Sequence, residues 1–191
     1  DCLAQHAPSV VIGASGTGKT VLARALANYK STKNSRTLLI CRNRLLSGEN
    51  KLLFKENPLV ECFSYFELMF DVIEASSLKD LEGNETLLKF KEAINKGVDL
   101  HLSLQDSDYR YLEENSETLL KHYFGTFDSI VVDEGQQFTL EQLNALRELL
   151  TEENNHSFNI FADPLQSPHK KWRPPKWCFK FPNLNIPRFF G

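Results

Sequence analysis

The stretch that decides the fold reads Gly13-Ala14-Ser15-Gly16-Thr17-Gly18-Lys19-Thr20. It fits G-x-x-x-x-G-K-[ST] at every fixed position, a pattern typical of a P-loop, which binds the phosphate groups of a nucleotide. The glycines let the loop turn tightly, so that its backbone N–H groups face the phosphate oxygens. We expect Lys19 to place a positive charge on the outer phosphates and the Thr20 hydroxyl to coordinate magnesium.

The residues on either side of this loop have the pattern that a P-loop requires. Residues 9–12 form a short β-branched apolar run, as in a buried strand, and residues 20–29 have the apolar spacing of a helix face. The free N–H groups at the start of that helix favour a bound anion. A glycine turn without a ligand is the alternative, and the flanking strand and helix argue against it.

Apolar strands alternate with helical segments along the rest of the chain. Strands are expected at 37–41, 60–63, 127–133 and 158–162, and helices at 65–75 and 139–150. This order predicts an α/β fold with a parallel sheet flanked by helices. We expect one domain over residues 1–191, with a helical insertion at about 76–121 and a basic, aromatic and mostly loop-like tail at about 164–191.

Two adjacent carboxylates, Asp133 and Glu134, follow the clearest of these strands. A parallel strand delivers such residues to the carboxyl edge of the sheet, where ligands of open α/β folds bind. We expect Asp133 to hold the magnesium ion and Glu134 to polarise the attacking water as a general base. The pair favours hydrolysis over phosphoryl transfer to a small acceptor, and a solvated acidic turn is the alternative.

Composition and cysteine usage place the chain among soluble globular proteins. Of its 191 residues, 41% are hydrophobic and 25% are charged. No apolar run reaches the roughly 18 residues that a membrane helix needs. The four cysteines form no C-x-x-C pair, which argues against a zinc site and predicts a reduced, cytoplasmic protein.

Basic residues gather after the last acidic residue, although the net charge is −3. Residues 170–180 read KKWRPPKWCFK and mix cations with aromatic rings. Single-strand nucleic-acid binding uses this mixture, because cations contact the backbone and rings stack on bases. Alternatively, the rings pack the end of the domain against a missing neighbour and the lysines are solvated, and composition does not decide between the two interpretations.

Several segments together resemble the first RecA-like domain of UvrD-like superfamily 1 helicases. Residues 133–138 (DEGQQF) are similar to motif II, which is close to D-E-x-Q-D, and residues 161–167 (FADPLQS) to motif III. Residues 38–46 (LLICRNRLL) and 62–68 (CFSYFEL) are similar to motif Ia and the T-F-H-x-L element after it. The resemblance implies a RecA-like P-loop NTPase fold, ATP and Mg²⁺ as cofactors, and the motor domain of an ATP-hydrolysing helicase or translocase.

The resemblance also implies roles for single residues. Gln166 would sense the γ-phosphate, Gln136 would link the metal site to motif III, and Arg188 would approach the γ-phosphate from a segment similar to motif IV. The residues that would contact the nucleic-acid strand are Arg42, Arg44, Ser64, His169, Trp172 and Arg173. The chain departs from the family at Gln137, where an Asp is usual, and at Pro187, where an aromatic that stacks on adenine is usual.

The partners that the resemblance implies are single-stranded nucleic acid, DNA in such helicases, and a second RecA-like domain in the same or a longer chain. That second domain would bring an arginine finger, so we expect slow hydrolysis without it. No membrane partner is expected. Two alternatives remain open: a P-loop NTPase switch or regulatory ATPase without helicase activity, and a nucleotide-binding scaffold that has lost hydrolysis.

Overall fold

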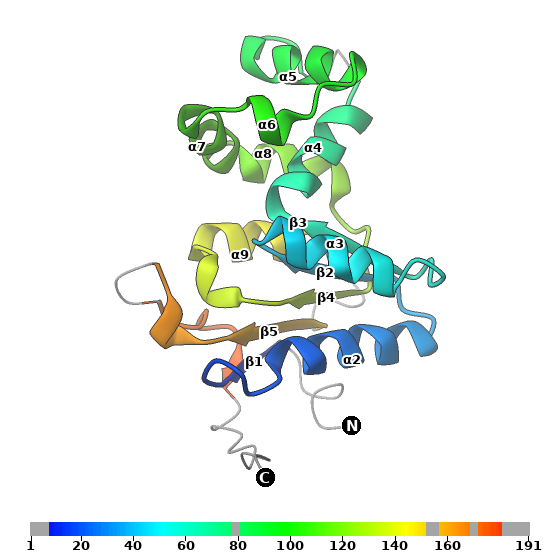
Figure 1. The fold of residues 1–191 in the computed structure, drawn as a ribbon, viewed down its shortest axis with the longest axis vertical. Helices are drawn as coiled ribbons and strands as arrows, with labels where there is room; N and C mark the ends of the chain where they lie inside the picture. Colours follow the sequence, from blue (N-terminus) through cyan, green and yellow to red (C-terminus); the bar gives the residue numbers. More distant parts are fainter. Residues whose placement is uncertain (1–7, 78–80, 152–156, 169–171, 181–191) are drawn as a thin grey trace.

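A parallel sheet forms the centre of the computed structural model, which describes residues 8–77, 81–151, 157–168 and 172–180 (Figure 1). Its strands are β1 (Ser9–Ile12), β2 (Thr37–Cys41), β3 (Val60–Ser64), β4 (Ser129–Val132), β5 (Phe158–Ala162) and β6 (Phe179–Lys180). Their order is β3-β2-β4-β5-β1-β6, and each pair of neighbours is parallel. The predicted α/β fold with a parallel sheet is confirmed.

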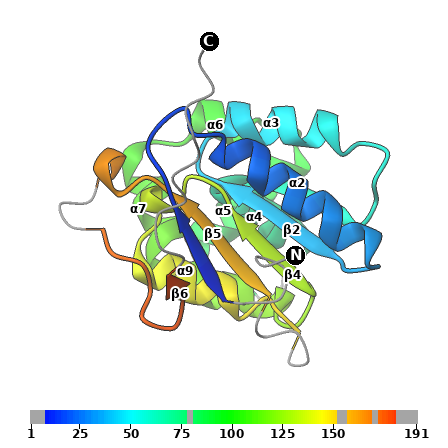
Figure 2. The same cartoon turned by 90° about the horizontal axis from the view of Figure 1, so that it is seen from below.

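Helices cover both faces of this sheet (Figures 1 and 2). Helix α2 (Lys19–Thr32) and the end of α3 (Arg44–Leu53) pack on one face, and α4 (Tyr65–Ala75) and α9 (Leu140–Arg147) on the other. Along β2, Leu38 packs in the core on the α4 side and Leu39 in the core on the α2 side. Because both faces of the central strands are buried, β1, β2, β4 and β5 are mostly apolar, which made them easy to recognise in the sequence.

A group of short helices between α4 and β4 extends away from the sheet (Figure 1). These helices are α5 (Glu85–Asn95), α6 (Leu100–Ser103), α7 (Asp106–Glu114) and α8 (Ser116–Leu120), followed by the 3-10 turn η1 (Lys121–Tyr123). Their side chains Leu87, Phe90, Leu100 and Leu112 are buried in the same core as α4 and α9. The inserted helices therefore share one continuous core with the sheet.

Two elements depart from the expectations. Helix α3 was not predicted: the face that it buries carries the polar Ser47 and Asn50, while Leu45 and Leu52 are exposed. The tail was expected to be mostly loop, yet its two-residue strand β6 pairs with β1. A strand this short leaves no pattern in the sequence.

The observed bounds of some helices and strands differ by a few residues from the predicted ones. Strand β4 is shorter than the predicted 127–133, and α9 ends three residues before the predicted limit of 150. Helix α2 is longer than the predicted 20–29. The expected cap of α9 is present, because the Thr139 hydroxyl accepts a hydrogen bond from the backbone of Gln142 at 3.3 Å.

Glu67 connects the start of α4 to α3. Its carboxylate accepts hydrogen bonds from the Ser64 backbone N–H and the Ser47 hydroxyl, each at 2.7 Å, and lies 3.1 Å from the Lys51 ammonium. Burial alone would raise the pKa of Glu67, but the bonds from Ser64, Ser47 and Lys51 outweigh burial and lower it to about 2.

We expect Glu67→Gln to lower the free energy of unfolding by about 2 kcal/mol at pH 7. Since the folded pKa lies below the unfolded value of about 4.3, this contribution is complete above the unfolded value and is lost as the pH falls towards 2. Urea unfolding at pH 7 and pH 3 should show a smaller difference between wild type and variant at pH 3. The exposed Glu74 of the same helix supplies the control Glu74→Gln, and an equal loss at both pH values would contradict the prediction.

Candidate nucleotide-binding site

The predicted phosphate loop lies between β1 and α2, at the carboxyl edge of the sheet (Figure 2). Gly16 and Gly18 have φ values of 73° and 81°, which side chains with a Cβ rarely adopt. The backbone N–H of Gly13 donates to the Ala162 carbonyl at 3.1 Å and ties the loop to β5. Helix α2 begins at Lys19, so its first free N–H groups face the loop, as an anion site requires.

Lys19 is held against the loop. Its side chain is buried, and its ammonium donates to the Ala14 carbonyl at 2.8 Å. The Thr17 hydroxyl donates to the same carbonyl at 2.7 Å. A full positive charge therefore lies beside the backbone N–H groups that would bind phosphate oxygens.

Asp133 follows β4 directly and is fully buried. Its Oδ1 accepts from the Glu134 backbone N–H at 3.0 Å, while Oδ2 makes no hydrogen bond of ordinary geometry with any residue that the structure describes. Burial raises the pKa of the Asp133 carboxyl, and the neighbouring Thr20 hydroxyl, the Glu134 N–H and the Lys19 charge oppose that rise. Such an unsatisfied carboxylate oxygen beside a hydroxyl fits a hard divalent cation.

A metal ion here would have few protein ligands. Within the described ranges there is no cluster of three or more His, Cys, Asp or Glu side chains that could hold a metal on its own. Magnesium suits this arrangement, because it usually binds through one or two protein oxygens together with substrate phosphates and water. Thr20 and Asp133 are the side chains that would hold it.

Glu134 has a left-handed backbone conformation, with φ 55°, which a residue with a side chain adopts rarely and mostly where the surrounding structure imposes it. Its carboxylate accepts a hydrogen bond from the Gln136 amide in the 3-10 turn η2 (Gly135–Gln137). The Oε1 atom of Gln136 accepts from the Asp163 backbone N–H at 2.9 Å. Gln136 is fully buried and thus connects Glu134 to the end of β5.

This connection reaches the 3-10 turn η4 (Pro164–Gln166), which follows β5. The Ser167 hydroxyl donates to the Gln136 carbonyl at 3.0 Å, and Asp163 caps the turn by accepting from Leu165 N–H at 3.1 Å. Gln166 itself is exposed. Because β5 lies between β1 and β4, Gln166 shares the sheet edge with the P-loop and with Asp133.

Gly135 is a site residue for which no role was predicted from the sequence. A Cβ atom on Gly135 would lie 2.2 Å from the Cγ2 atom of Ile160, so the turn after Glu134 packs directly on β5. Glycine is therefore required for close approach of the two segments. The signal in the sequence was its place inside the D-E-G-Q run, where the motif II pattern allows any residue.

The residues predicted to contact nucleic acid make other contacts. The Arg42 guanidinium lies 2.7 Å from the Glu113 carboxylate, and that of Arg44 lies 3.2 Å from Asp99. Ser64 caps α4 and is buried. Nothing in these contacts brings the three residues together into one exposed surface.

The described part of the tail packs mainly on the domain itself. The Trp177 indole N–H donates to Asn144 at 3.0 Å, and its ring meets Phe158 edge to face at 5.2 Å. Trp172 is partly buried against the same core, whereas Arg173 is exposed. The structure thus packs Trp177 on this domain itself, whereas the packing interpretation expected the rings to meet a missing neighbour. The predicted site residues His169 and Arg188 lie outside the described residues.

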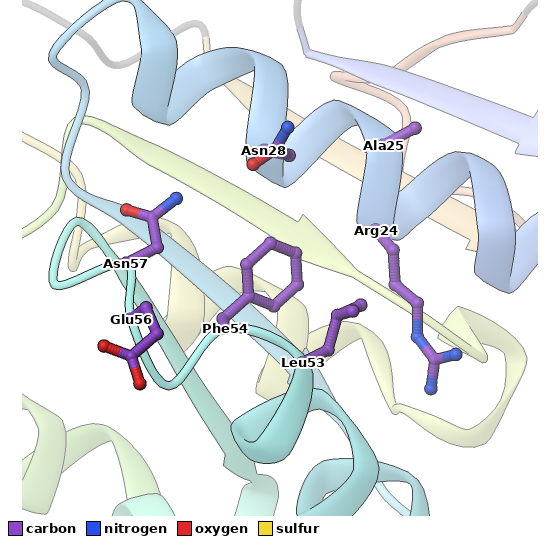
Figure 3. A pocket seen from close by; sticks show the side chains of 7 residues that line it. All are labelled: Arg24, Ala25, Asn28, Leu53, Phe54, Glu56 and Asn57. Carbon is purple, nitrogen blue, oxygen red and sulfur yellow. The ribbon is translucent and has the colours of Figure 1, made fainter.

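A hollow of about 410 Å³ lies away from these residues, between α2 and the segment that ends α3 (Figure 3). It is lined by Arg24, Ala25, Asn28, Leu53, Phe54, Glu56 and Asn57. The Arg24 guanidinium donates hydrogen bonds to the Asn50 side-chain oxygen at 2.7 Å and to the Glu49 carboxylate at 3.0 Å. None of the predicted site residues lines this hollow, so we do not assign it to the nucleotide.

Comparison with known proteins gives the family. A family model described as an AAA domain matches residues 4–162, which include the P-loop, Asp133, Glu134 and all of β5. No curated protein matches the chain. Among the helices that the structure describes, none is both long enough and apolar enough to cross a bilayer. Since the match covers well over half of the sequence and includes the whole P-loop, the chain belongs to the AAA domain family and is a P-loop ATPase domain.

Proposed function

We propose that this chain is the ATP-hydrolysing motor domain of a helicase or translocase of the superfamily 1 type. The observation that carries the proposal is the bridge from Glu134 through Gln136 to the backbone of Asp163. A motor must transmit the state of its nucleotide to another binding surface. This bridge ties the hydrolytic carboxylate to the turn that carries Gln166 and that is similar to motif III.

Each residue of the nucleotide site has its own role in ATP hydrolysis. The N–H groups of the P-loop and the Lys19 ammonium bind the phosphate tail of ATP and stabilise the charge that develops during hydrolysis. A magnesium ion held by Thr20 and Asp133 would neutralise charge on the phosphate oxygens. Glu134 accepts a proton from the water whose oxygen attacks the γ-phosphorus, as the bond from that phosphorus to ADP breaks. Gln136 orients the Glu134 carboxylate through its amide.

The partners of this motor are part of the proposal. Gln166, exposed at the same sheet edge, would report the γ-phosphate to the strand-binding segments. Arg188 and a second RecA-like domain would complete the nucleotide site. Single-stranded DNA would bind over the exposed Arg173, the partly buried Trp172 and the loop after β2.

A regulatory ATPase without helicase activity is the second candidate, and one observation favours it. Arg42 forms an ion pair with Glu113. Trp177 donates a hydrogen bond to Asn144, and its ring contacts that of Phe158. Groups that a nucleic-acid strand would use are thus occupied within the domain. The two candidates differ in whether a nucleic-acid strand changes the rate of ATP turnover.

The test is phosphate release from ATP, with magnesium, in the presence and absence of oligo(dT), by the protein that includes the second RecA-like domain which the proposal requires. The motor proposal expects the strand to accelerate turnover, because a motor hydrolyses ATP productively only while it is bound to the strand on which it moves. Equal turnover with and without the strand would overturn the motor proposal in favour of the regulatory ATPase. No turnover under either condition would overturn both.

The bridge itself can be tested through Gln136→Ala. We expect turnover to fall by about 10–100-fold while ATP affinity stays close to that of wild type, because the change frees the Glu134 carboxylate without touching the P-loop. The control is Asn95→Ala, which removes an amide from the exposed end of α5 and leaves the residues of the bridge unchanged. Equal effects of the two substitutions on turnover would show that Gln136 does not position Glu134.

A further inference from the structure

Arg42 lies at the carboxyl end of β2 and is enclosed by the helical insertion. Its Nη2 atom lies 2.7 Å from the Glu113 carboxylate of α7. Its guanidinium carbon is 5.4 Å from the centroid of the Tyr65 ring and 4.8 Å from that of Phe66, both on α4. Arginine is well suited to bind phosphate, because its planar fork presents paired donors.

We propose that Glu113 is an autoinhibitory latch: it occupies Arg42 and thereby withholds from a nucleic-acid strand a phosphate contact on the motor domain. This inference rests on the proposed function, since the strand is the ligand that Arg42 would bind. It assigns to the inserted helices a role that neither the nucleotide site nor the family match requires. The latch opens when the Glu113 side chain, which is partly exposed, turns away from Arg42.

The closed latch does not satisfy Arg42 fully. Its Nη1 atom is buried and lacks a hydrogen-bond partner among the residues that the structure describes. A buried donor without a partner carries a desolvation cost, which reduces the net stability of the closed state. A phosphate bound in bidentate fashion would satisfy both nitrogen atoms of the fork. The cation–π contacts with the rings of Tyr65 and Phe66 can persist while the anionic partner changes.

The latch is also in contact with the segment that follows Glu134. The Phe138 ring meets Tyr65 edge to face at 5.6 Å, and Tyr65 lies against Arg42. The Gln142 amide donates to Glu113 at 3.3 Å, while its oxygen accepts from the Thr139 backbone at 3.0 Å. A shift of the turn after Glu134 on nucleotide binding would therefore act on both sides of the Arg42–Glu113 pair.

The experiment compares Glu113→Gln with Glu114→Gln in fluorescence-anisotropy titrations of labelled oligo(dT), with ATP turnover measured alongside. Both variants lose one negative charge from α7, but Glu114 is exposed and lies outside the latch. Release of a partly exposed ion pair is worth about 1 kcal/mol, so Glu113→Gln should bind the strand about five-fold more tightly than Glu114→Gln. Thermal unfolding confirms that each variant is folded.

A second pair of variants tests whether the gain passes through Arg42. Arg42→Gln should weaken strand binding more in the Glu113→Gln background than in wild type, because the latch keeps Arg42 from the strand in wild type. Equal affinities of Glu113→Gln and Glu114→Gln, with wild-type turnover still accelerated by the strand, would overturn the latch alone. Absence of strand binding and acceleration in wild type and all variants would overturn the motor proposal with it. Stronger acceleration by the strand in Glu113→Gln than in wild type and Glu114→Gln would support the latch.

Discussion

Glu134→Gln should bind ATP as wild type does, yet release phosphate about 10²–10⁴-fold more slowly. The physical reason is that Gln keeps the shape of the side chain and can still hydrogen-bond Gln136, but cannot accept a proton from the attacking water. The P-loop and Lys19, which hold the phosphates, lie on β1 and α2 and are untouched by the change. The loss should therefore fall on kcat with little change in ATP affinity.

The control for this prediction is Glu141→Gln, which removes the same charge from the exposed first turn of α9. Its turnover should equal that of wild type. The measurement is steady-state phosphate release together with ATP binding by calorimetry in the presence of magnesium. Turnover of Glu134→Gln within about two-fold of wild type would remove Glu134 from the role of general base, since general bases contribute at least about 10²-fold.

The parts of the structure that the sequence predicted all depend on residues that are close together in the chain. Strands buried on both faces are mostly apolar, so 37–41 and 158–162 were recognised with the bounds that the structure has. The P-loop was recognised because its backbone geometry requires glycine at fixed positions, as φ at Gly18 shows. Asp133 and Glu134 were recognised because they follow directly after a strand, which fixes their edge of the sheet.

The parts that the sequence could not predict depend on contacts between distant residues. Glu113 and Arg42 are separated by 71 positions, and no local pattern indicates that they pair. The need for glycine at position 135 arises from Ile160 on the neighbouring strand. The mixed cations and rings of the tail allowed both strand binding and packing against a missing neighbour, and nothing in the sequence indicated that Trp177 would pack on Phe158 of this domain.

The buried carboxylate of Asp133 lowers the stability of the free protein but is needed to bind magnesium. Replacing it should therefore change both stability and turnover strongly. The carboxylate is fully buried, its pKa is raised by burial, and its Oδ2 atom has no regular hydrogen bond among the described residues. Because the folded pKa lies above the unfolded value, the ionised form destabilises the fold at neutral pH, and stability rises as the pH falls towards the unfolded value. A bound magnesium ion would offset that cost.

Asp133→Asn should therefore have two opposite effects. Without nucleotide, Tm should rise by about 2–4 °C, because removal of a buried charge is worth about 1 kcal/mol and the Asn amide can donate to the Thr20 hydroxyl. With ATP and magnesium, turnover should fall by about 10²-fold or more, because the site loses its charged metal ligand. Differential scanning calorimetry and phosphate release give the two readings. Asp106→Asn, on the exposed start of α7, is the matched control.

The decisive comparison is the rise in Tm that magnesium and ATP produce together. Ligands stabilise a protein in proportion to the logarithm of their concentration over Kd, so wild type should gain several degrees at saturating nucleotide and magnesium. Asp133→Asn should gain only what ATP provides without the metal. If magnesium raises the Tm of the variant as much as that of wild type, Asp133 does not bind the ion. Its buried charge would then be a cost to the fold for which the proposed site gives no reason.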